Sequence, residues 1–96
     1  MALSKVAGED ISTRRRRLRY RAWHRGMREM DLILGPYVDE HIEAMDTPAL
    51  DRLEVLMDEL DADLLIWVLG QEPAPVDLDP ELIADLAAHC RERHRI

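Results

Sequence analysis

The sequence lacks several features that would direct it to a membrane, an oxidising compartment or a β-sheet fold. It contains no phenylalanine and one cysteine, Cys90, so no internal disulfide can form. No apolar run approaches the roughly 20 residues that a membrane-spanning helix needs. The first residues show no apolar segment of the kind found in secretory signals. β-branched residues are sparse as well, so we expect one small helical domain in a reducing compartment.

The chain also lacks the residue patterns of common catalytic and cofactor sites. No glycine-rich loop follows a credible strand, which argues against a nucleotide site. Both serines, Ser4 and Ser12, lie in or beside the N-terminal tail and support no Ser-His-acid triad. Cys90 and His94 could face one metal ion, but two ligands make a poor zinc site. We therefore predict no catalytic residue, no metal site and no stably bound cofactor.

Charge is distributed very unevenly along the chain, whose net charge is −7. Residues 1–28 hold nine basic and two acidic side chains, and residues 29–85 hold one basic and 17 acidic ones. Residues 86–96 hold three basic side chains and one acidic. Such a dipolar chain suits charge-guided docking to another protein, whereas proteins that bind nucleic acid are more often basic overall.

Four consecutive arginines, Arg14 to Arg17, give the basic segment its highest charge density. We interpret them as a solvated helix face. Tyr20 and Trp23 follow as a neighbouring aromatic pair, and such interleaving also occurs in RNA-binding segments. A small helical RNA-binding or regulatory protein that uses the Arg14–Arg21 segment is therefore the alternative to a protein-docking domain.

The first helix is expected to follow a flexible tail over residues 1–11, which shows no periodicity. Ser12 or Thr13 can cap this helix, which should run through the arginines to about His24 or Arg25.

The second helix is expected to begin near Met27 or Arg28, and its apolar residues recur at intervals of three and four. Gly35-Pro36 should kink or break it, because proline lacks the amide donor and clashes one turn back. The stripe consists of Met30, Ile33, Leu34, Tyr37, Val38, His41, Ile42 and Met45.

Three further helices are predicted after position 46. Thr47-Pro48 should cap and start the third helix, Asp61 should cap a fourth over residues 62–69 closed by Gly70, and Asp79-Pro80 should start the fifth. The fourth is apolar nearly all round and is expected to be the most buried. The third should bury Leu50, Leu53, Leu56, Met57 and Leu60 and expose Asp51, Glu54, Asp58 and Glu59; the fifth should bury Leu82, Ile83, Leu86, Ala87 and Cys90. Together the signals predict an all-α, compact five-helix antiparallel bundle, a single domain over residues 12–96.

The sequence RGMREMD, residues 25–31, lies where the basic segment meets the acidic one. Gly26 can take a positive φ and end the first helix, and Glu29 lies in the first turn of the next helix, where an acid is favoured. The pattern indicates a helical corner with exposed arginines. A rigid turn that presents charged side chains and a methionine also suits a protein-docking surface.

This corner belongs to a longer run, residues 17–31, that resembles the signature of the SdhE-type FAD assembly factors. That family includes mitochondrial succinate dehydrogenase assembly factor 2, and its hallmark RGxxE corresponds here to Arg25, Gly26 and Glu29, in the longer form RGMxExD. Residues 32–38, the Trp-containing segment 64–70 and Pro73-Ala74-Pro75 also resemble the family. The likeness covers roughly residues 17–96 and leaves the N-terminal tail outside.

The resemblance implies a five-helix bundle that acts as an assembly chaperone and is not itself an enzyme. Family members promote covalent attachment of FAD to a histidine of the flavoprotein subunit of succinate dehydrogenase, and in bacteria also of fumarate reductase. It implies that such a subunit is the partner, that FAD attachment happens in that partner, and that the free chain is a monomer. The residues it assigns to partner binding are Arg17, Arg21, Arg25, Gly26, Met27, Arg28, Glu29 and Asp31.

From this resemblance we form two further expectations. The corner should enter an interdomain cleft of the partner, and Gly26→Arg should abolish function while leaving helix content largely intact. A bacterial cytoplasmic location is expected, with the mitochondrial matrix as the alternative for a processed form, and neither nucleic acid nor membrane insertion is expected.

Overall fold

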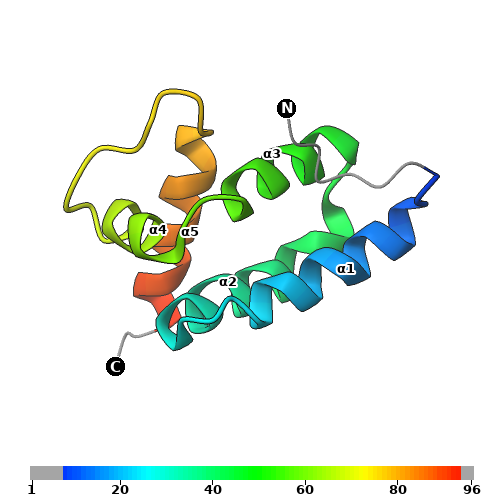
Figure 1. The fold of residues 1–96 in the computed structure, drawn as a ribbon, viewed down its shortest axis with the longest axis horizontal. Helices are drawn as coiled ribbons and strands as arrows, with labels where there is room; N and C mark the ends of the chain where they lie inside the picture. Colours follow the sequence, from blue (N-terminus) through cyan, green and yellow to red (C-terminus); the bar gives the residue numbers. More distant parts are fainter. Residues whose placement is uncertain (1–7, 94–96) are drawn as a thin grey trace.

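The computed structural model describes residues 8–93, and these form five α-helices and one 3-10 turn with no strand among them (Figure 1). The all-α prediction is therefore confirmed. α1 and α2 run side by side in opposite directions, α3 lies above them, and α4 and α5 gather at one end. The bounds are α1 Ile11–Trp23, α2 Arg28–His41, η1 Ile42–Ala44, α3 Thr47–Met57, α4 Asp61–Val68 and α5 Pro80–Arg93.

The core draws on all five helices. Most residues of the predicted stripes on α2 and α5 are buried or packed against this core. The fully or nearly fully buried apolar residues are Leu18, Ala22, Met30, Ile33, Leu34, Tyr37, Val38, Ile42, Leu50, Leu53, Leu56, Met57, Leu64, Val68, Leu78, Leu82, Ile83 and Leu86.

The N-terminus of α1 is capped by Asp10, so the prediction of Ser12 or Thr13 as the cap is wrong. The Thr13 backbone N–H donates to Asp10 Oδ1 at 2.7 Å, and the helix begins at Ile11. An aspartate side chain satisfies one of the free amides of the first turn as well as serine does. Residues 1–7 of the predicted tail lie outside the described residues.

Pro36 lies inside α2, which runs without a break from Arg28 to His41, so the predicted break does not occur. Proline leaves the carbonyl of Leu32 without its helical donor. Leu32 lies on the exposed side of α2, where water can replace that donor. The neighbouring Gly35 has a packing role, because a Cβ atom there would overlap the ring of Trp23 from α1.

α3 differs from its prediction at three places. Its cap is Asp46, which accepts the Ala49 backbone N–H at 3.0 Å, rather than Thr47. Leu60 lies beyond the helix and is 72% exposed, although it was expected in the apolar face. Glu54 was expected in solvent, yet it is only 2% exposed and buried against α1.

The arginine cluster explains why Glu54 is buried. Arg14 is 5% exposed, and its Nε lies 2.7 Å from Glu54 Oε1. Arg17 pairs with Glu54 and with Glu9 at 2.8 Å, and Arg15 donates to backbone carbonyls after α2. The expectation of a solvated arginine face is therefore wrong, because only Arg16 of the four is fully exposed. The cluster joins α1 to α3 by buried ion pairs.

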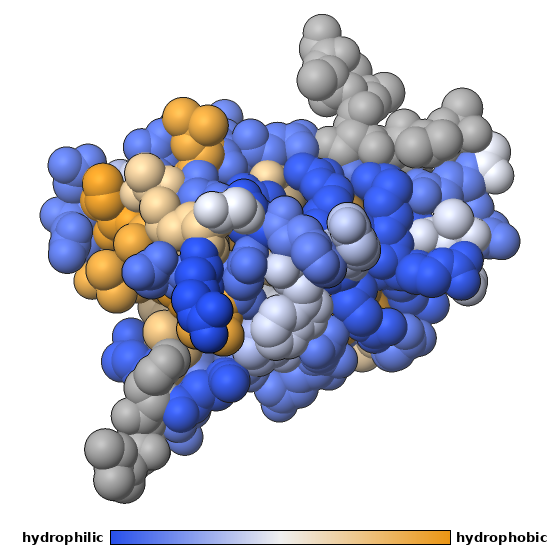
Figure 2. Space-filling view, turned by 60° about the horizontal axis from the view of Figure 1, so that its bottom comes forward, coloured by the Kyte–Doolittle hydropathy of each residue, from blue (hydrophilic) through white to orange (hydrophobic). Residues whose placement is uncertain are grey.

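α4 is not the most buried element, contrary to the prediction. Its buried residues are Leu64 and Val68, and Leu69, which follows the helix, is 54% exposed. Its N-cap is Leu60, and Asp61 makes an ion pair instead of capping the helix. The helix lies at the end of the molecule, and Figure 2 shows apolar side chains gathered on the surface at that end, where Figure 1 places α4 and the loop before α5.

Candidate functional site

Four residues, 24–27, turn the chain between α1 and α2. Gly26 has φ of +95°, a conformation that side chains with a Cβ rarely adopt, so a glycine is required for this corner. His24 ends α1, and its ring stacks on Tyr20 with centroids 4.0 Å apart. Trp23 instead donates from Nε1 to Asp39 Oδ2 at 3.1 Å, so the predicted aromatic pair is divided between two separate contacts.

Arg25 lies folded inward, although the arginines of the corner were expected to be exposed. Its side chain is 9% exposed, and its Nε lies 2.7 Å from Asp61 Oδ1 at the start of α4. Nη1 donates to the carbonyl of Met57 at 2.5 Å, and Nη2 donates to that of Glu59 at 2.9 Å. A planar guanidinium is suited to such divergent contacts. Arg25 thus fastens the corner to the turn between α3 and α4.

Asp31 holds the corner from its other side. Its Oδ1 accepts the backbone N–H of Arg25 at 2.6 Å. A carboxylate that accepts a main-chain donor fixes the path of the chain as well as the side chain. Arg25 and Asp31 therefore act as the frame of the corner.

The remaining residues of the motif point outward or lie at its edge. Gly26, Arg28 and Glu29 are exposed, and Met27 is half-buried and packs against the core. Within residues 8–93, neither the Arg28 side chain nor the Glu29 side chain has a hydrogen bond or ion pair. Two exposed side chains of opposite charge, adjacent in sequence, are therefore available to bind a partner at this fixed corner.

Arg17 and Arg21, also predicted to bind the partner, lie about two turns and one turn, respectively, before the corner on α1 and face α3. Arg21 Nη2 lies 3.1 Å from Asp58 Oδ1, and Arg17 is held by Glu9 and Glu54. The structure therefore brings both arginines into internal ion pairs and not into the exposed part of the corner.

Sequence reasoning missed one cluster of potential metal ligands: Glu40, His41 and His89 come together from α2 and α5. His94, which was considered with Cys90 and judged a poor two-ligand site, lies outside the described residues. Among residues 8–93, no helix has the length and apolar character needed to cross a membrane.

A family model described as the flavinator of succinate dehydrogenase matches residues 16–90, which include the whole corner. This chain belongs to the flavinator family. Several curated relatives agree. A protein of Acetobacter pasteurianus named FAD assembly factor SdhE is 31% identical over 90 residues, which cover 94% of this chain and 83% of that protein.

Mitochondrial relatives in the flavinator family are longer than this chain. Succinate dehydrogenase assembly factor 2 of Aedes aegypti is 33% identical over 90 residues, covering 91% of this chain and 55% of that protein. The factor of the same name from Candida glabrata is 38% identical over 64 residues, covering 67% of this chain and 42% of that protein. The chain thus spans about half the length of the mitochondrial relatives it matches.

Proposed function

We propose that this chain is an assembly factor that binds the flavoprotein subunit of succinate dehydrogenase and promotes covalent attachment of FAD to a histidine of that subunit. Membership of the flavinator family supports the proposal, as do the names of the bacterial and mitochondrial relatives. The flavoprotein subunit of fumarate reductase is a second candidate partner.

The observation that carries the proposal is that the corner contains two residues that hold its shape and two charged residues that are exposed. Arg25 and Asp31 hold the turn in place, while Arg28 and Glu29 extend into solvent without a partner in the described chain. The backbone of the corner is already fixed, so only the side chains lose conformational freedom when they bind. They can form charge-assisted hydrogen bonds with a partner without the further cost of ordering a loop.

Such contacts would assist attachment by fixing a domain arrangement of the partner. The reaction needs the flavin and the histidine in near-attack geometry, and it needs stabilisation of the negative charge that develops on the flavin. Gly26 has open space around its α-carbon, so the partner's backbone can approach closely. In this proposal the reacting groups belong to the partner, and the chain is an accessory factor and not an enzyme.

We also propose that FAD is not held stably by the free chain, which acts as a monomer. The central segment is strongly acidic and disfavours a pyrophosphate. A fluorescence titration of free FAD with the purified chain tests this point, and tight binding would contradict it. Bacterial and mitochondrial relatives both match, so the proposal covers a bacterial cytoplasmic location or, for a processed form, the mitochondrial matrix.

The RNA-binding alternative is weakened by the internal contacts of most of the arginines that suggested it. Arg14, Arg17 and Arg21 are engaged with carboxylates, and Arg15 with backbone carbonyls. Pairing with an RNA phosphate would require these internal contacts to break first.

The test combines the chain, the FAD-free flavoprotein subunit and FAD, and reads covalent flavin as fluorescence on a denaturing gel. Glu29→Ala should lower both partner affinity and covalent flavin by about tenfold or more, the value of one charge-assisted hydrogen bond. Arg16→Ala removes an exposed arginine of α1 and serves as the control with unchanged yield. Full flavin attachment and unchanged affinity with Glu29→Ala would show that Glu29 only stabilises the start of α2.

A further inference from the structure

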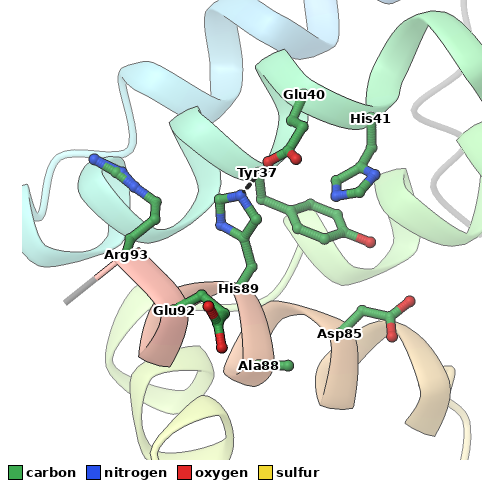
Figure 3. Close-up of a pocket in the computed structure, with 8 residues that line it drawn as sticks. All are labelled: Tyr37, Glu40, His41, Asp85, Ala88, His89, Glu92 and Arg93. Atoms are coloured by element: carbon green, nitrogen blue, oxygen red, sulfur yellow. Dashed lines mark hydrogen bonds and ion pairs between the residues drawn. The ribbon is translucent and has the colours of Figure 1, made fainter. Parts of the chain in front are cut away.

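Two histidines and a glutamate meet between the end of α2 and the second half of α5 (Figure 3). Glu40 and His41 are the last residues of α2, and His89 faces them from α5. One potential ligand atom from each side chain lies within 4.8 Å of the other two. The docking corner lies at the opposite end of α2, so this cluster has no part in the proposed function.

We propose that Glu40, His41 and His89 form a binding site for a divalent transition-metal ion of the zinc class. Two imidazoles and one carboxylate are a ligand set that zinc uses with a fourth position left to water. Magnesium and calcium prefer oxygen ligands throughout, so the two ring nitrogens select against them.

The side chains need only a small adjustment to hold such an ion. A tetrahedral ion with bonds of about 2.0–2.2 Å keeps its ligand atoms roughly 3.4 Å apart. The distance between Glu40 Oε2 and His89 Nε2, now 2.5 Å, must increase. The longer distances between ligand atoms of the cluster, which are within 4.8 Å, must decrease. The Glu40 side chain is 62% exposed, so it can rotate without disturbing the core.

The two ring nitrogens of His89 have different surroundings. Its Nε2 lies against Glu40, while its Nδ1 is buried and has no hydrogen-bond partner within residues 8–93. Nε2, the nitrogen that faces Glu40, is the one placed to bind an ion, and it does so in the neutral ring form that metal ligation requires.

The surroundings favour a cation over an anion. Asp85 and Glu92 line the same pocket, about one turn before and one turn after His89 on α5. Figure 3 shows the guanidinium of Arg93 directed away from the two histidines. The ring of Tyr37 lies beside both of them, with its centroid 4.3 Å from that of His41 and 5.5 Å from that of His89. This ring restricts the movement of both imidazoles.

The test uses the full chain freed of metal by a chelator and titrated calorimetrically with Zn²⁺, with Co²⁺ as an absorption probe for tetrahedral coordination. We expect one ion per chain. His41→Gln, His89→Gln and Glu40→Gln should each weaken Zn²⁺ binding by at least about tenfold. His24→Gln is the matched control, since it removes an exposed imidazole at the end of α1 and should leave the affinity unchanged.

Circular dichroism checks that each variant is folded. Should His89→Gln fail to fold, the Glu40 and His41 variants decide the question, because both residues lie at the solvent-accessible end of α2. The proposal is overturned by the absence of binding at about 50 µM Zn²⁺, by ligand variants that bind as the unsubstituted chain does, or by an equal loss with His24→Gln.

Discussion

The inward orientation of Arg25 predicts that its loss destabilises the whole domain. Arg25→Ala removes an ion pair with Asp61 and two hydrogen bonds to backbone carbonyls near the turn between α3 and α4. The carboxylate of Asp61, whose side chain is 15% exposed, would be left without its cation.

The size of the effect follows from burial. Removing one partner of a buried ion pair costs about 3–5 kcal/mol, and partial access of water to Asp61 places the expected loss near 3 kcal/mol. That is a large part of the roughly 5–15 kcal/mol that stabilises a domain. At about 4–8 °C per kcal/mol, the melting temperature should fall by roughly 12–24 °C.

Urea unfolding followed by circular dichroism measures this loss directly. Arg28→Ala is the matched control within the same motif, because Arg28 is exposed, and its loss should stay within about 0.5 kcal/mol. Arg25→Lys should lie between the two, since lysine keeps the charge but cannot reach Asp61 and both carbonyls together. A free energy of unfolding for Arg25→Ala within about 0.5 kcal/mol of the unsubstituted chain would refute the role of Arg25 as an internal fastener.

Two further predictions concern Glu54, which is buried between α3 and α1, and Asp10, which caps α1. Glu54→Gln leaves the buried Arg14 guanidinium facing a neutral amide and should cost about 3 kcal/mol in urea unfolding, whereas Glu43→Gln at the surface should cost less than about 1 kcal/mol. The hydrogen bond from the amide of Thr13 lowers the pKa of Asp10 in the folded state. The stabilisation by this cap is therefore fully present above the unfolded-state pKa of about 3.9. It is lost as the pH falls through the lower folded-state pKa. Asp10→Asn keeps the cap without titrating, so its free energy of unfolding should decline less on acidification, and parallel pH curves would contradict this reasoning.

The number and order of the helices follow from periodicity, but the partners of charged residues do not. The spacing of α3 places Glu54 opposite its leucines, which predicts exposure. Its burial arises because Arg14, 40 residues earlier, packs on that face from α1. The predicted burial of α4 is wrong for a related reason. The apolar character of a segment does not indicate that its helix lies at the end of the molecule. The caps of α1 and α3 shift by one to three residues because neighbouring Asp, Ser and Thr compete for the same amides.

The same limit applies to the sites. The glycine of the corner was predictable, because a helix end followed by a new periodicity calls for a positive φ at Gly26. The hydrogen bonds of the Arg25 side chain were not predictable, since its acceptors lie 32 to 36 residues later in the chain. His89 lies 49 residues after Glu40, so their cluster follows no short motif. Only the fold brings these groups together.

Asp61 lies outside the RGxxE motif, yet the structure makes it part of the corner. Asp61→Asn removes the charge that holds Arg25 Nε and should cost about 2 kcal/mol, because Arg25 keeps its two carbonyl acceptors. If the corner must be held rigid to act on the flavoprotein subunit, the variant should also yield less covalent flavin at a temperature where it is folded, although Arg28 and Glu29 are unchanged. Asp63→Asn, on the same helix, is the control for a lost acid. An unstable Asp61→Asn that still supports full flavin attachment would show that the exposed pair acts without this support.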